Sequence, residues 1–100
     1  MRKGGSDFGQ EGAQTLAISA LTFLASDPQR LSRFLDMVGV EAAGIRQAAA
    51  EPGFLGAVLS HLMADEALLL AFAANEGITP ESVVKAARAL GNEPWERGYA

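Results

Sequence analysis

Eight consecutive apolar residues, Ala67–Ala74, constrain the fold of this chain more than any other feature. Asp65 before the run and Gly77 after it are typical helix start and end residues, so the run predicts a helix over about 66–76. A helix that is apolar all round has no side to turn toward water and is expected to be buried all round. We therefore predict that this helix lies at the centre of the molecule. We favour coverage by the chain's other helices over coverage by a second copy.

The composition fits a single helical domain and excludes several kinds of chemistry. One hundred residues, 49% of them hydrophobic, are enough for one core. The net charge of −4 argues against general affinity for nucleic acid or an anionic membrane, and a spanning helix needs about 20 apolar residues. The absence of Cys excludes disulfides and thiol catalysis, and a single His excludes a multi-histidine metal site. We expect a cytoplasmic protein with a flexible leader over residues 1–12 and one helical domain over 13–100.

Proline, glycine and aspartate divide the chain into six amphipathic or apolar segments. Strand signals are weak, because no alternation of apolar and polar residues persists. The first helix is expected at about 13–26, the second at 28–38, closed by Gly39, and a short third at about 41–50. A fourth starts at Glu51-Pro52-Gly53 and carries Phe54 to Leu62, the fifth covers 66–76, and the sixth runs from Thr79-Pro80 to Leu90. These segments predict an all-α fold, a compact bundle of five or six short helices.

The chain also shows a candidate internal repeat. Sliding the sequence along itself lays Leu16–Ala50 over Phe54–Arg88 without gaps, an alignment that we call the repeat register. Matching residues include Asp27 with Asp65, Phe34 with Phe72 and Gly39 with Gly77, and each pair has a mechanical role in a capped helix. Two explanations stay open: a true duplication, which would give two three-helix repeats, or the similarity that any two capped amphipathic helices share.

Residues 72–90 resemble a helix-turn-helix, which makes DNA binding one alternative function. In that arrangement Thr79, Lys85 and Arg88 would be the DNA contacts. DNA binding requires positive contacts to phosphates, yet the long stretch between Arg46 and Lys85 contains no Lys or Arg. A tight structural corner between two helices explains the same pattern, and we prefer that interpretation.

Two further residues are candidates for a functional role. His61 lies at the edge of the fourth helix's apolar face, with Asp65 one turn on, so a small enzyme around His61 is the third hypothesis. That enzyme would need a surface pocket holding His61 and two carboxylates, and no nucleophile is marked beside it. Trp95 is either a tail residue docked on the bundle or a contact for a partner. We assign no catalytic residue, cofactor or metal ligand.

Several short segments resemble a known family: Leu24–Pro28, Arg33–Leu35, Pro52–Leu55, Asp65–Leu69, Ala86–Arg88 and Trp95–Arg97. The chain is similar over Thr15 to Arg97 to a family of small uncharacterised bacterial proteins, mainly alphaproteobacterial, known as a domain of unknown function. The resemblance implies an intracellular, all-helical protein and carries no activity, cofactor or site residue. The function we predict is a small, non-catalytic protein-interaction module whose partner is another protein or a second copy.

Overall fold

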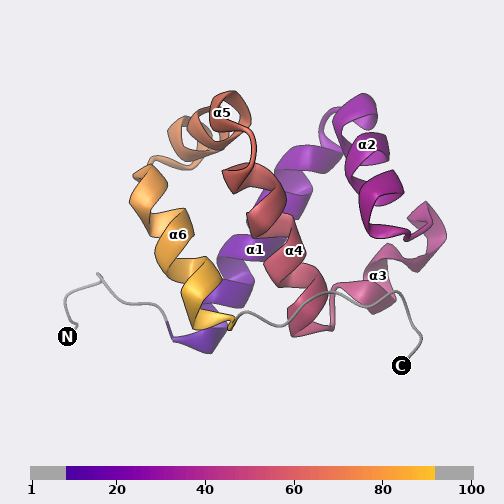
Figure 1. The fold of residues 1–100 in the computed structure, drawn as a ribbon, viewed down its shortest axis with the longest axis horizontal. Coiled ribbons are helices and arrows are strands. Elements are labelled where there is room, and N and C mark those ends of the chain that lie inside the picture. The colour runs from indigo at the N-terminus through magenta and orange to yellow at the C-terminus, as the bar shows by residue number, and fades with distance from the viewer. Residues whose placement is uncertain (1–8, 92–100) are drawn as a thin grey trace.

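The computed structural model describes residues 9–91, except for the side chain of Pro52. This part of the chain forms an all-α bundle (Figure 1). Its elements are α1 (Gln10–Ala25), α2 (Pro28–Val38), the short 3-10 helix η1 (Ala42–Gly44), α3 (Ile45–Ala48), α4 (Pro52–Met63), α5 (Glu66–Glu76) and α6 (Pro80–Ala89). The predicted fold class is therefore confirmed. The predicted leader lies mostly outside the described residues, and α1 begins slightly before its expected start.

The centre of the bundle is formed by α1 and α4, which pack against each other. In Figure 1 they cross in the middle, with α5 and α6 on one side and α2 and α3 on the other. α4 contributes four fully buried large side chains, Phe54, Val58, Leu59 and Leu62. α1 presents a row of small residues that allows close approach of its neighbours: Ala13, Ala17 and Ala20, each 0% exposed. α6 packs across both central helices.

The prediction that Ala67–Ala74 lies at the centre is wrong, because α5 lies at the periphery of the bundle (Figure 1). It buries Leu68, Phe72 and Ala73, whereas Leu70 is 48% exposed. The physical reason is side-chain size. Half of the apolar run is Ala, which removes little area from water when buried, so the larger Phe, Leu and Val side chains of α4 gain more from the central position.

The described helices follow the predicted repeat register. In this alignment α2 coincides with α5, and the part of α1 from Gln14 onward coincides with α4. Asp27 and Asp65 occupy equivalent N-cap positions, where their side chains accept backbone N–H bonds from Gln29 and Leu68 respectively. Both helices end on a left-handed glycine, with φ 74° and ψ 31° in one and φ 71° and ψ 32° in the other. The two halves differ mainly in their third segment, which is η1 and α3 in the first half and the longer α6 in the second.

Between residues 9 and 91, no single helix is both long and apolar enough to cross a membrane. α4 and α5 reach the required length and hydropathy only as a pair, and that pair is bent by 108°.

Candidate functional site

A cleft of about 330 Å³ opens between α2, the end of α4 and the start of α5. We call it the α2–α5 cleft, and six residues line it: Arg30, Arg33, His61, Asp65, Ala67 and Leu68. It is therefore lined by two arginines, one histidine and one aspartate beside an apolar wall. Polar residues from separate parts of the chain meet here although no sequence motif connects them.

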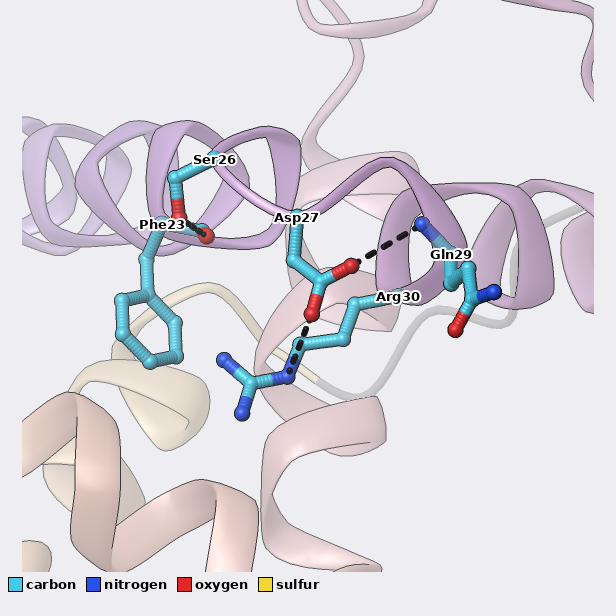
Figure 2. A network of polar contacts seen from close by, with 5 residues as sticks. All are labelled: Phe23, Ser26, Asp27, Gln29 and Arg30. Carbon is cyan, nitrogen blue, oxygen red and sulfur yellow. Dashed lines mark hydrogen bonds and ion pairs between the residues drawn. The ribbon is translucent and has the colours of Figure 1, made fainter.

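Arg30 is oriented by two contacts at the corner between α1 and α2. Its Nε lies 3.7 Å from Oδ2 of Asp27, and its guanidinium carbon lies 5.4 Å from the centre of the Phe23 ring. Figure 2 shows the ring and the guanidinium on the same side of this corner. The other oxygen of Asp27 accepts the backbone N–H of Gln29 at 3.0 Å, so this carboxylate both caps α2 and positions Arg30.

His61 is partly buried between α4 and α2, where its ring packs against Phe34 with centroids 5.1 Å apart. Burial lowers the pKa of His61 below its usual value, because the protonated ring loses hydration. The negative charge of Asp65 acts in the opposite direction, and the positive charge of Arg33 lowers the pKa further. The net lowering favours the uncharged form of the imidazole.

The hypothesis of an enzyme around His61 receives no added support from this geometry. The cleft contains one carboxylate, that of Asp65, whose Oδ1 accepts the backbone N–H of Leu68 at 3.2 Å as the cap of α5. The hypothesis required a second carboxylate in the cleft, but the other charged residues that line it are two arginines. Among residues 9–91 no group of three His, Cys, Asp or Glu side chains is placed to hold a metal ion.

The residues proposed to contact DNA lie at and after the corner between α5 and α6. Thr79 is the N-cap of α6, and its Oγ1 accepts the backbone N–H of Ser82 at 3.3 Å. That hydrogen bond gives Thr79 a structural role. Lys85 and Arg88 are exposed on α6. DNA binding stays a prediction, and Trp95, the candidate partner contact, lies outside the described residues.

Comparison with known proteins identifies the family of this chain. The family model described as "Protein of unknown function (DUF3572)" matches residues 10–93. The chain belongs to this family. The match confirms the resemblance to a domain of unknown function, and it ends before Trp95–Arg97, which we had included in the resemblance. No curated protein and no solved structure matches the chain.

A second feature of this DUF3572 protein is the difference between the outer faces of its equivalent helices α2 and α5. At four positions α2 exposes polar residues, namely Gln29, Ser32, Arg33 and Asp36. The residues at the same four positions of α5 are also exposed, and all are apolar: Ala67, Leu70, Ala71 and Ala74. One position near the helix end is reversed, since exposed Met37 of α2 stands where α5 has Asn75. The two helices have the same length and caps, so the fold does not require the apolar face on α5.

Sequence reasoning missed the cleft, and for the apolar helix it kept cover by a second copy only as the less favoured alternative. The favoured interpretation placed Leu70 in the core, and neither Arg30 nor Arg33 was given a functional role. The repeat register held the missing signal, because it sets Arg30 against Leu68 and Ser32 against Leu70. A difference in polarity between equivalent positions marks residues that the shared architecture does not explain.

Proposed function

We propose that this DUF3572 protein is a small, non-catalytic, cytoplasmic interaction module that binds a protein partner through the outer face of α5. The partner we consider first is a second copy of the chain. The observation that carries the proposal is the apolar outer face of α5 at four positions where α2 is polar.

The energetics of α5 support this proposal. Leu70 is 48% exposed, and burying its remaining apolar area would release free energy at about 25 cal/mol per Å². The three alanines beside it would allow the backbone of a partner helix to approach closely. Glu66, Asn75 and Glu76 stand at the ends of α5 and leave the middle of the face free of charge.

The size of the outer face of α5 limits the affinity that we expect for self-association. Stable interfaces bury about 800 Å² per partner, and one face of an eleven-residue helix offers less. We therefore expect an association that depends on protein concentration rather than an obligate dimer.

Sedimentation equilibrium over a wide range of protein concentration tests the proposal with two matched variants. Leu70→Glu places a charge in the middle of the α5 face and should weaken self-association roughly tenfold or more, because the buried charge would have no partner. Ser32→Glu makes the same change at the equivalent position of α2 and should leave association unchanged. A strict monomer at every concentration would remove a second copy as the partner, and equal loss in both variants would remove α5 as the interface.

A further inference from the structure

We propose that the α2–α5 cleft binds the oxyanion group of a small ligand, a phosphate or a carboxylate, through Arg30 and Arg33. This inference does not rest on the proposed interface on α5, although Ala67 belongs to both surfaces. It is carried by the position of these arginines in the repeat, their surroundings in the cleft and the shape of the cleft.

The repeat shows that the fold does not need polar residues at these positions. In the repeat register, Arg30 is equivalent to Leu68 and Arg33 is equivalent to Ala71. Arg30 and Leu68 both line the cleft, so the cleft lies across the junction of the two halves. Because the second half builds the same α-helix with apolar residues there, forming α2 does not require the two cations.

The surroundings of the two arginines leave them able to bind an anion. Asp27 and the Phe23 ring hold the guanidinium of Arg30 in place, so less rotamer entropy is lost when it binds a ligand. Arg33 makes no ion pair with any residue between 9 and 91 and is exposed. The carboxylate of Asp65 is engaged as the cap of α5.

The cleft also limits the size and character of the ligand. A volume of about 330 Å³ is at the lower end of the range for small-molecule sites. Guanidinium forks match the oxygen pairs of carboxylates and phosphates, and buried Leu68 beside Ala67 provides an apolar wall. The ligand class is therefore a small organic acid or organic phosphate with a short apolar part.

His61 offers a direct readout, because it is the only histidine of the chain and it lines the cleft. We would follow its imidazole proton resonances by NMR at fixed pH in the untagged chain. Inorganic phosphate and acetate form two separate arms, and sodium chloride at matched ionic strength is the control. We expect a saturable shift with at least one of the two oxyanions and none with chloride.

Two matched variants test whether the anion that shifts the His61 resonances binds in the α2–α5 cleft. Arg33→Gln should weaken the saturable binding roughly tenfold, because it removes a charge-assisted hydrogen bond. Arg46→Gln removes an exposed arginine outside the cleft and should bind as the original chain does. Saturation by phosphate alone would identify a phosphate group as the ligand, and saturation by acetate alone would identify a carboxylate. Shifts that do not saturate with either anion, or equal behaviour of the two variants, would overturn the proposal.

Discussion

His61 packs against Phe34 with their ring centroids 5.1 Å apart and their ring planes inclined by 56°. The contact has a counterpart in the pair Phe23 and Phe72, whose centroids are 5.5 Å apart and whose planes are inclined by 59°. The repeat register makes Phe23 equivalent to His61 and Phe34 equivalent to Phe72, so the two contacts correspond. Each half therefore places a ring of its first helix against a ring on the second helix of the other half.

This equivalence leads to a prediction about pH. The folded protein has a lowered His61 pKa, so the unfolded chain binds a proton more readily. Stability should be complete above the unfolded value of about 6.5 and should fall as the pH drops from there toward the folded value. His61→Phe installs the residue found at the equivalent position and should remove this part of the pH dependence. Urea unfolding of both proteins between about pH 5 and pH 8 measures the effect.

The comparison of the two pH profiles is itself the control, because every other titrating group is common to both proteins. His61→Phe can still pack its ring against Phe34, so the variant should remain folded. Parallel profiles for the two proteins would contradict the role assigned to His61.

Two glycines should respond to alanine in opposite ways. Gly77 has φ +71°, a conformation that strains any residue with a Cβ, and nothing lies within 4 Å of the position a Cβ would take. Gly77→Ala should therefore lower the free energy of unfolding by about 1 kcal/mol through backbone strain alone. Gly56 lies inside α4 with equally open space, so Gly56→Ala should raise it by about 0.5 to 1 kcal/mol.

Chemical denaturation of both glycine variants, with thermal melts as a second measure, checks this pair. Destabilisation by both substitutions would show that steric contact and not backbone conformation decides the outcome. Stabilisation by Gly77→Ala would contradict the left-handed end of α5.

The helix boundaries could be predicted from the sequence because the signals that set them are local. Asp27 and Pro28 start α2, Gly39 ends it, and the predicted bounds of 28–38 are those found. The third segment is shorter than expected, because the backbone forms the brief 3-10 helix η1 before α3. The repeat register could also be read from the sequence, since caps and buried rings recur at a fixed spacing.

The position of α5 and the cleft could not be predicted, because both depend on competition between distant segments. Local periodicity shows that Ala67–Ala74 lacks a polar face, but the central position went to the helix with larger side chains. Arg30 and Arg33 are ordinary surface residues of α2 in the sequence. They meet His61 only because α4 and α5 pack beside them.

The two helix caps should contribute similarly to stability. Asp27 accepts the N–H of Gln29 at 3.0 Å, and Asp65 accepts the N–H of Leu68 at 3.2 Å. Replacing either by Ala should cost about 1 kcal/mol of unfolding free energy, because a helix N–H loses its acceptor. Asn keeps an acceptor oxygen, so Asp27→Asn and Asp65→Asn should retain most of the stability in urea titrations. An Asn variant as unstable as its Ala counterpart would assign the effect to charge instead of capping.

Because α4 is central and α5 is peripheral, the same Leu→Ala substitution should lower the free energy of unfolding by different amounts in the two helices. Leu59 is 0% exposed, so Leu59→Ala should leave a cavity and cost about 2 to 5 kcal/mol of unfolding free energy. Leu70 is 48% exposed, so Leu70→Ala should cost less than about 1 kcal/mol at concentrations where the chain is monomeric. Urea unfolding at low protein concentration separates the two cases. If Leu70→Ala proved as costly as Leu59→Ala, α5 would be a core helix after all, and its outer face would no longer be available to a partner.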